Sequence, residues 1–199
     1  MALSDAYATA AEYRALTDMT DTTKDADILK DITAVSRYIE FKLDRFFNVE
    51  TINSVRTYLV AENTDALWVD DLSATPTLIE VDTNKDGVYD EEITDYELLP
   101  FNATLEPEPK PFMQIRLVPW GDKRVFYKGE RVQVTGLFGW PSVPEGVKRA
   151  TIHMTAILRL ESPRATRRIP ELGDTIEASS EGQAIVRQLL DKYKKGRYM

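Results

Sequence analysis

The spacing of apolar residues divides the chain into a helical start, a β-rich middle and a helical end. Near the N-terminus, Thr9 and Glu12 form a capping-box pattern that predicts a short helix ending at about Thr17. Thr22 and Asp25 give a weaker start signal for a second, longer helix. The apolar residues of that helix recur at spacings of three and four and therefore share one face: Ile28, Ile32, Val35, Ile39, Leu43 and Phe46.

After the second helix the apolar period falls to two, which is typical of strands. Val55, Thr57 and Leu59, for example, alternate with Arg56 and Tyr58, an alternation that predicts a strand with one buried face. Strands are predicted in six places: 55–59, 67–69, 78–81, 96–99, 113–117 and 132–135. The prolines that interrupt residues 100–119 indicate a loop or a sheet edge there.

Helical spacing returns after the turn at 139–141. Pro144 occupies a favoured first-turn position, and the helix that follows is expected to end before Pro163. Ser180 and Gln183 form a second capping box ahead of a last helix. The apolar faces of these two helices are Val147, Ala150, Thr151, Met154, Ile157 and Leu158, and then Ile185, Val186, Leu189, Leu190 and Tyr193.

These elements predict an α+β fold with a four-helix frame, made of two N-terminal and two C-terminal helices, and a β-rich insertion between the pairs. Neither pair of helices has enough apolar surface to form an independent domain, so we expect the two pairs to pack together. The expected segments are 1–49 for the N-terminal helices, 50–140 for the insertion, and 141–199 for the C-terminal helices and tail.

The net charge of −8 is unevenly distributed along the chain. Residues 145–199 contain 11 Lys and Arg against 7 Asp and Glu, whereas residues 1–144 contain 14 against 26. An acidic body is poorly suited to wrapping DNA or lying on an anionic membrane, because both kinds of binding use Lys and Arg. The basic end suits either an acidic protein partner or a solvated charged tail.

Composition narrows the class of protein further. With 43% hydrophobic and 29% charged residues, the chain resembles an ordinary globular protein. No apolar run approaches the roughly 20 residues that cross a bilayer, and residues 1–5 lack the features of a signal peptide. The absence of cysteine excludes disulfides and thiolate chemistry. We expect a soluble protein, made in a cytoplasm, that binds no membrane.

The sharpest local motif is the acidic turn at 82–90. Its oxygen-bearing candidates for a metal site are Asp82, Asn84, Asp86 and Asp90. Together with Gly87 they match the first half of a calcium loop, in which alternate oxygens face the cation. The twelfth position, which should be a glutamate, is Ile93, and the flanks look like strands. A β-hairpin tip is therefore the favoured interpretation, and no cofactor is expected unless this turn binds calcium.

Aromatic residues offer a second kind of candidate site. The turn at 138–141 contains a phenylalanine and a tryptophan, which we expect to close a core rather than to stack on nucleic acid. The alternative function for the chain is a calcium-dependent binding module that uses the Asp82–Asp90 turn and presents Trp68 or Trp140 to a glycan.

No group of residues predicts an active site. His153 is the only histidine, and no cysteine or second histidine is available to complete a typical transition-metal site. A hydrolase that uses His153 remains a third hypothesis, but the expected role is an exposed or interface residue. Three carboxylate pairs are expected in turns or loops, where solvent surrounds both members: Asp70-Asp71, Glu91-Glu92, and Glu106 with Glu108.

Three segments occur in an order that carries a family resemblance. They are an N-terminal helical stretch closing on an Arg-Phe pair, a hairpin followed by a β segment, and a strand leading through a Gly-Trp turn and a proline into a helix. In the chain these are residues 7–47, 86–100 and 132–150, of which the last is the most specific. Together they resemble the head-to-tail adaptor (connector) family of long-tailed bacteriophages.

The resemblance implies a non-enzymatic structural protein of the virion neck, made in the host cytoplasm. Such adaptors form a ring, commonly of twelve copies, that docks beneath the portal protein and extends the DNA channel. They offer a platform for a stopper or tail-completion protein, and DNA passes without sequence-specific binding. Their C-terminal segment often engages the portal. Carried over to this chain, the portal-contact candidates are Lys192, Tyr193, Lys194, Lys195, Arg197 and Tyr198.

Overall fold

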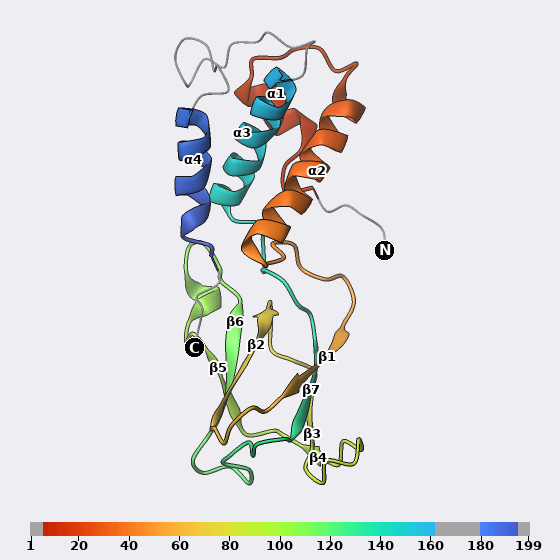
Figure 1. Cartoon of the computed structure of the whole chain (residues 1–199), viewed down its shortest axis with the longest axis vertical. Coiled ribbons are helices and arrows are strands. Elements are labelled where there is room, and N and C mark those ends of the chain that lie inside the picture. Colours follow the sequence, from red (N-terminus) through yellow and green to blue (C-terminus); the bar gives the residue numbers. More distant parts are fainter. Residues whose placement is uncertain (1–5, 162–179, 195–199) are drawn as a thin grey trace. The chain divides into compact units, whose positions relative to one another are not determined.

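The computed structural model describes residues 6–161 and 180–194. The chain divides into two compact units. We name them the helical unit, which is residues 1–45 with 143–199, and the β unit, which is residues 46–142. The described residues combine α-helices with two antiparallel sheets, so the predicted α+β class is confirmed (Figure 1).

The chain passes between the units a few residues from the places that the sequence predicted. It leaves the helical unit after Arg45 and returns at Val143, whereas the change of period predicted 50 and 141. The first difference arises because Phe47 is fully buried and packs its ring against Trp140, at a centroid distance of 5.3 Å. Residues just after the last turn of helix therefore belong to the β unit.

Helix α1 (Ala10–Leu16) begins at the predicted capping box. The Thr9 hydroxyl accepts a hydrogen bond from the backbone N–H of Glu12, and the Glu12 carboxylate accepts one from the backbone N–H of Thr9 at 2.7 Å. These bonds satisfy N–H groups that have no partner within the first helical turn. The helix ends at Thr17, as predicted.

Helix α2 (Asp25–Leu43) buries the predicted apolar face, from Ile28 to Leu43. Its start differs from the prediction, because the N-cap is Lys24 and no side chain caps the helix. Thr22 therefore does not serve as the cap. The helix ends at Asp44, whose φ of 51° is left-handed, so Phe46 lies beyond the helix that was expected to include it.

Helices α3 (Glu145–Glu161) and α4 (Ser180–Asp191) complete the helical unit. The Pro144 carbonyl accepts hydrogen bonds from the first turn of α3, which agrees with the proline's predicted place at the start of this helix. Ser180 is the first residue of α4, one position inside the expected cap, a difference within the usual uncertainty of helix ends. Within the described ranges, no helix is long and apolar enough to cross a bilayer.

Helix α3 is the centre of the helical unit and contacts α1, α2 and α4 (Figure 1). A small apolar core joins α1, α2 and α3 and consists of Ala8, Tyr13, Ile28, Ile32, Ile152 and Ala156. The buried hydroxyls of Thr151 and Thr155 donate to carbonyls one turn earlier in α3, so their burial leaves no unsatisfied donor. Arg159 and Asp31 form an ion pair between α3 and α2.

The β unit contains two antiparallel sheets, with strand orders β1-β7-β3-β4 and β2-β6-β5. The strands are β1 (Ser54–Leu59), β2 (Ala66–Leu72), β3 (Leu78–Asp82), β4 (Glu91–Glu92), β5 (Tyr96–Leu99), β6 (Phe112–Leu117) and β7 (Arg131–Gly136). All six predicted strands are present. Strand β4 was missed because a strand of two residues is too short for an alternating pattern to show.

Both sheets direct alternate apolar side chains into one core. The first sheet contributes Ile79, Val81, Val132 and Val134, and the second contributes Leu67, Val69, Ile115 and Leu117. Phe126 and Phe138, both fully buried, belong to the same core. The period of two in the sequence therefore identified inward residues of β6 and β7, namely Ile115, Leu117, Val132 and Val134.

Strand β1 is oriented the opposite way to its polarity pattern. Its apolar residues Val55 and Leu59 are 55% and 69% exposed, while Arg56 and Tyr58 face inward and are half-buried. The inward face is polar because Arg56 forms ion pairs with Glu50 and Asp70 there. An alternating pattern predicts a strand. It does not show which face is buried when polar side chains on the inward face form ion pairs or hydrogen bonds there.

A buried ion-pair group lies in the β unit beside the core. The Lys123 ammonium is 2.9 Å from Glu91 and 3.1 Å from Glu130, whose side chains are 35% and 3% exposed. Burial by itself lowers the pKa of Lys123, but the two carboxylates outweigh it, so the net direction is upward. The cation therefore neutralises a carboxylate that would otherwise be buried alone.

We expect Lys123→Met to lower the free energy of unfolding by about 3 kcal/mol at neutral pH, because Glu130 would remain buried without its cation. Urea unfolding measures the loss, and Lys128→Met, at an exposed position, is the matched control. Because the folded-state pKa of Lys123 is raised, its contribution is complete at neutral pH. The difference should shrink as the pH rises above about 10.4, the ordinary lysine value. Equal losses in the two variants would contradict this role.

Candidate functional site

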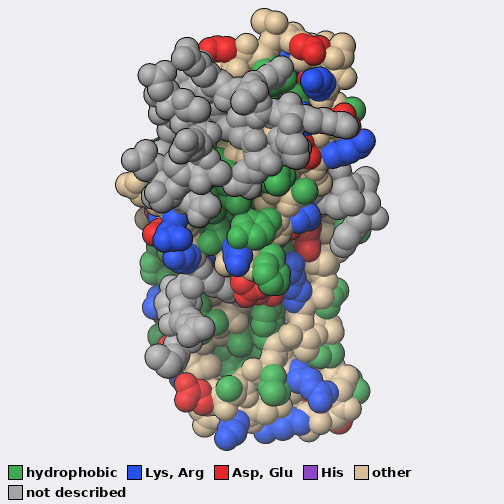
Figure 2. Space-filling view, turned by 45° about the horizontal axis from the view of Figure 1, so that its top comes forward, with side chains coloured by type: hydrophobic (Ala, Val, Ile, Leu, Met, Phe, Trp, Pro, Cys, Tyr) green, Lys and Arg blue, Asp and Glu red, His purple; other side chains and the backbone are tan. Residues whose placement is uncertain are grey.

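Large hydrophobic side chains are exposed on both units, and Figure 2 shows several of them, in green, on one face. The most exposed are Phe41 at 82%, Leu105 at 79%, Ile52 at 76% and Trp120 at 75%. Single exposed hydrophobic residues are normal, but groups of them mark surfaces that meet a partner. The candidate functional features of this chain are therefore contact surfaces and the structures that hold them in place.

The segments by which the chain enters and leaves the β unit are bound to each other, and we call this place the entry–exit junction. The backbone N–H of Glu50 donates to the Phe138 carbonyl at 2.9 Å, and the Glu50 carboxylate accepts from the Phe138 N–H at 3.2 Å. Gly139 has a φ of +105°, and a Cβ atom there would lie 1.9 Å from the Asn48 carbonyl oxygen. Only glycine therefore permits this close approach.

Trp140 closes the junction as a packing residue. It is 4% exposed, its ring lies against Phe47, and its indole N–H donates to the Asp71 carboxylate at 3.1 Å. The carbonyl of Asp71 accepts from the N–H of Gly139 at 2.7 Å. The prediction that this aromatic turn closes a core is confirmed. Trp140 is consequently not available to stack on a base or a glycan, whereas Trp68 is 44% exposed.

An ion-pair group on the inward face of β1 stabilises the same junction. The Arg56 guanidinium contacts Glu50 and Asp70, each at 3.0 Å, and lies 3.9 Å above the ring of Phe138. Burial lowers the pKa of Arg56, but hydrogen bonds to Asp70 and Glu50 outweigh it and the net direction is upward. Burial raises the pKa of Tyr58, whose hydroxyl donates to Asp70 at 3.3 Å. Both side chains therefore keep their usual protonation states at neutral pH.

Two of the three carboxylate pairs differ from the prediction that solvent would surround both members. Asp70 and Asp71 lie in β2: Asp70 pairs with Arg56, and Asp71 is 6% exposed and bound to Trp140. Glu91 lies in β4 and pairs with Lys123. The sequence contained a usable signal, because the Asp residues follow an apolar run within a strand pattern. The partners across the sheet could not be identified without the fold.

The acidic turn at 82–90 is the tip of the β3–β4 hairpin, as the favoured interpretation predicted. Asp82 is fully buried, and its two carboxylate oxygens accept from the backbone N–H groups of Asp86 and Gly87, each at 3.0 Å. Asp90 accepts from the side chains of Thr83, at 2.9 Å, and Asn84, at 2.8 Å. The oxygens suggested as calcium ligands are thus acceptors for donors within the turn.

Among the residues that the structure describes, no group of three or more His, Cys, Asp or Glu side chains is arranged to hold a metal ion. Arg131 adds a positive charge 3.9 Å from Asp82, which opposes cation binding. The turn geometry therefore favours a structural role for Asp82 and Asp90.

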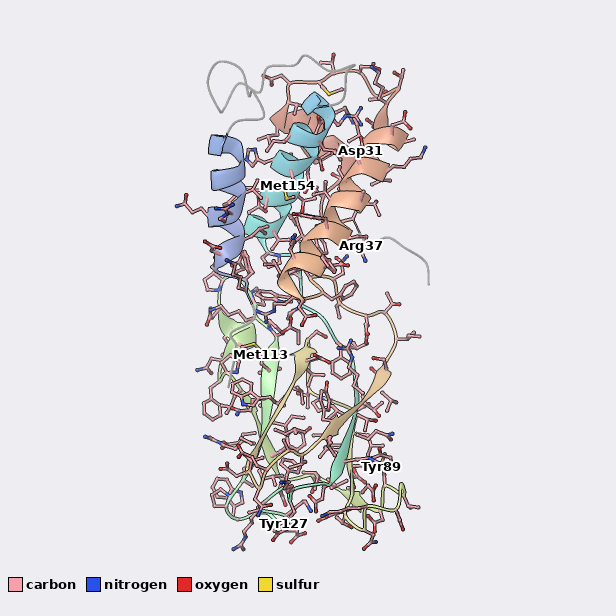
Figure 3. The ribbon with its side chains drawn as sticks, in the orientation of Figure 1. Asp31, Arg37, Tyr89, Met113, Tyr127 and Met154 are labelled. Atoms are coloured by element: carbon pink, nitrogen blue, oxygen red, sulfur yellow. The ribbon has the colours of Figure 1, made fainter. Side chains whose placement is uncertain are left out.

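The hairpin tip lies at one end of the β unit together with the loop between β6 and β7. The Lys85 ammonium donates to the Lys128 carbonyl at 2.8 Å, which joins the two loops. Figure 3 places the labelled Tyr89 and Tyr127 toward this end, where Tyr127 is 54% and Trp120 is 75% exposed. This end of the β unit therefore offers an aromatic surface on a well-bonded set of loops.

The portal-contact candidates are only partly within the described residues. Tyr193 is 2% exposed, and its hydroxyl would lie 2.9 Å from a Cβ placed on Gly146, so it packs against α3. Its carbonyl accepts from Arg45 at 3.3 Å. Lys192 and Lys194 are exposed, and the Lys192 ammonium lies 4.6 Å from the Tyr193 ring. The other candidates, Lys195, Arg197 and Tyr198, lie outside the described residues.

His153 lies on α3 and is half-buried. Helix α3 also has Met154 and Ile157 on its surface toward α2 and α4, and these apolar residues line a groove. The hydrolase hypothesis stays a prediction.

Comparison with known proteins gives a fold-level match. No protein-family model matches the chain, and neither does any curated protein. Among solved structures, a chain in the neck of an empty gene transfer agent (GTA) particle, computed with C6 symmetry, matches with a TM-score of 0.59 and 16% identity. The match covers 100% of this chain and 95% of that chain.

A second solved structure, the neck of a native GTA particle computed with C12 symmetry, matches with a TM-score of 0.57 and 17% identity. The match covers 100% of this chain and 94% of that chain. At these identities the comparison establishes a shared fold, over the whole of this chain and 95% and 94% of the two matched chains. The expectation of a neck-type fold is confirmed at that level.

Gly139→Ala should destabilise the protein far more than Gly87→Ala, although both glycines have positive φ. At Gly87, where a Cβ meets nothing within 4 Å, we expect a loss of about 1 kcal/mol from backbone strain alone. At Gly139 the clash with Asn48 adds to the strain, and we expect a loss of about 4 kcal/mol or more. Urea unfolding followed by tryptophan fluorescence measures both. Similar losses would show that the close approach at the junction is unimportant.

Asp82→Ala should lower the free energy of unfolding by about 2 kcal/mol, because two N–H groups of the turn would lose their acceptor. Asn84→Ala, at an exposed position in the same turn, is the control and should cost less than about 1 kcal/mol. Millimolar calcium should leave the Tm of the wild type unchanged. A calcium-dependent rise that Asp82→Ala abolishes would instead support a calcium site.

Proposed function

We propose that the chain is a structural neck protein of a tailed-phage-like particle, a head-to-tail adaptor that forms a ring below the portal. The observation that carries this proposal is the fold shared over the full length with chains in two GTA necks. The order of motifs in the sequence supports it independently. In this role the protein is not an enzyme, and it is located in the virion neck after synthesis in the host cytoplasm.

The ring proposal agrees with the symmetry of the matched particles, whose necks were computed with C6 and C12 symmetry. A cyclic ring of more than two copies requires each subunit to present two different, complementary surfaces. We propose twelve copies, in which the four helices of the helical unit act as the frame. The β unit, with its exposed aromatic residues, offers the contact surface for a stopper or tail-completion protein.

The charge distribution suits a channel through which DNA passes. Residues 1–144 contain 14 basic and 26 acidic residues, so the larger part of the chain repels phosphates. A channel wall that repels DNA allows passage without sequence-specific binding and without sticking. The basic residues are concentrated after Glu145, where they are available to a protein partner.

We propose that the C-terminal segment contacts the portal through Lys192 and Lys194, whose ammonium groups are exposed. Tyr193 lies between them and is buried in the helical unit, so its part is to anchor the segment against α3. Charge-assisted bonds to carboxylates on the portal would then supply specificity.

Coexpression with the portal protein encoded in the same particle genome tests this function. We expect a stable complex in which electron microscopy shows a ring of this chain stacked on the portal, with sixfold or twelvefold symmetry. Lys192→Glu with Lys194→Glu should weaken the complex about tenfold or more, because two attractions become repulsions. Lys148→Glu with Arg149→Glu is the control at other basic positions. If the chain neither forms a ring nor binds the portal, the proposed function is wrong.

A further inference from the structure

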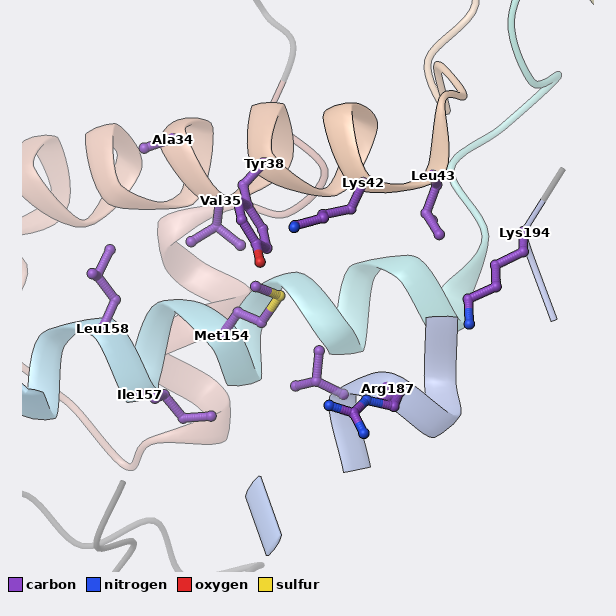
Figure 4. A pocket seen from close by; sticks show the side chains of 11 residues that line it. Ala34, Val35, Tyr38, Lys42, Leu43, Met154, Ile157, Leu158, Arg187 and Lys194 are labelled. Carbon is purple, nitrogen blue, oxygen red and sulfur yellow. The ribbon is translucent and has the colours of Figure 1, made fainter. Parts of the chain in front are cut away.

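A groove of about 730 Å³ lies in the helical unit among α2, α3 and α4 (Figure 4). Its apolar wall includes Tyr38 from α2 and Met154, Ile157 and Leu158 from α3. Tyr38 is 49% and Leu158 is 45% exposed, so two of these side chains leave a large apolar area in contact with solvent. Such an area suits an apolar side chain from a partner.

The charged residues that line the groove are all cations. They are Lys42, Arg187 and Lys194, all of them exposed, and the described lining contains no carboxylate. The Lys42 ammonium lies 5.4 Å from the Tyr38 ring, and Lys194 pairs with Asp191 at 2.6 Å outside the lining. A partner for this groove therefore combines an exposed apolar side chain with neighbouring carboxylates.

The β unit carries a loop with that combination, at residues 101–108. A short 3₁₀ turn, η1 (Ala103–Leu105), presents Leu105 at 79% exposure, and Phe101 nearby is 56% exposed. Glu106 and Glu108 follow directly in the sequence. Among the described residues, three large hydrophobic side chains are more than 75% exposed: Phe41, Ile52 and Leu105. Of these, only Leu105 is followed by two glutamates within three positions.

The loop is held in shape before any contact forms. Ala103 is fully buried and its carbonyl accepts from the Lys110 N–H at 3.0 Å, while the Leu105 N–H donates to the Asn102 carbonyl at 2.9 Å. Pro107 lies directly after Glu106 and fixes its own φ. A preformed loop loses little conformational entropy on binding. The Glu106 carboxylate is 2.5 Å from Lys110, an exposed pair that is weak and exchangeable.

We infer that the groove of one copy receives the loop at 101–108 of a second copy, with Leu105 against the apolar wall and the two glutamates beside Lys42 and Arg187. This inference rests on the proposed ring and names one of its contacts. A head-to-tail contact in a cyclic ring needs two different surfaces on the same chain, and this chain has a complementary pair. The opposite charges select the orientation in which the loop enters.

Cross-linking between single-cysteine variants tests the contact, because the chain has no cysteine of its own. Leu105→Cys and Leu158→Cys are expressed separately, mixed, assembled with the portal protein and oxidised. Only a contact between copies joins the two variants, since each contains one thiol. We expect the mixed disulfide dimer in clear excess over the pair of Leu105→Cys with Val55→Cys, a mismatch on β1 that is more exposed than Leu158 (55% against 45%).

Charge reversal adds a second measurement. Lys42→Glu with Arg187→Glu should reduce the mixed cross-link about tenfold, and Glu106→Lys with Glu108→Lys on the partner should restore it. Lys42, Arg187 and Glu106 are exposed and Glu108 is half-buried, so the circular dichroism spectrum and the Tm should stay unchanged. Restoration by the reversed pair is an effect that a general loss of stability does not produce.

The outcomes separate this inference from the proposed function. If rings form on the portal but the matched pair cross-links no better than the mismatch, the contact is wrong and the ring stands. If no ring forms and no cross-link appears, both the ring and the contact fail. A matched cross-link that charge reversal does not weaken would also overturn the contact, because the opposite charges would then play no part.

Discussion

The β unit depends on one close approach, where the backbone of Gly139 passes the carbonyl of Asn48. A Cβ atom at Gly139 would lie 1.9 Å from that oxygen, so the contact is possible only for glycine. It joins the segment that enters the β unit to the segment that leaves it. Trp140, on the leaving segment, packs against Phe47 on the entering segment and donates a buried hydrogen bond to Asp71 of β2. An insertion anchored at both ends in this way returns the chain close to its point of departure, which leaves the helical pairs free to form one unit.

The sequence predicted the elements well, because apolar periodicity is a local property. All four helices and six of the seven strands followed from it, as did the hairpin tip at residues 82–90. It did not predict the polar inward face of β1. Arg56 can face inward because it forms ion pairs with Glu50 and Asp70, and these partners are known only from the fold. It missed the Asp71–Trp140 bond for the same reason, since the partners are 69 residues apart. Long-range polar pairs become visible only when the fold is known.

The candidate site was predictable to a similar extent. The Asp82–Asp90 turn was located correctly, and its favoured structural role follows from carboxylates that accept from the turn's own N–H groups. Tyr193 was proposed as a contact residue, but it is buried against α3. The helical spacing of apolar residues had placed it on a buried face, whereas the basic residues around it favoured an exposed contact. The groove beside Tyr38 required the packing of three helices and had no counterpart in the sequence.

The proposed function requires a protein that holds contacts with its neighbours. The helical unit offers a groove with cations at its border, and the β unit offers preformed loops with exposed apolar side chains. The loop at 101–108 is held by its own backbone hydrogen bonds, which reduce the entropy lost on assembly. The acidic majority of the chain suits a wall along which DNA moves.

Cryo-electron microscopy of particles purified from a strain that carries this gene tests the central claim most directly. The account predicts a ring of density between the portal and the tail into which the helical and β units fit, in several symmetric copies. Particles that lack this chain, or that contain it at a position away from the neck, would contradict the account.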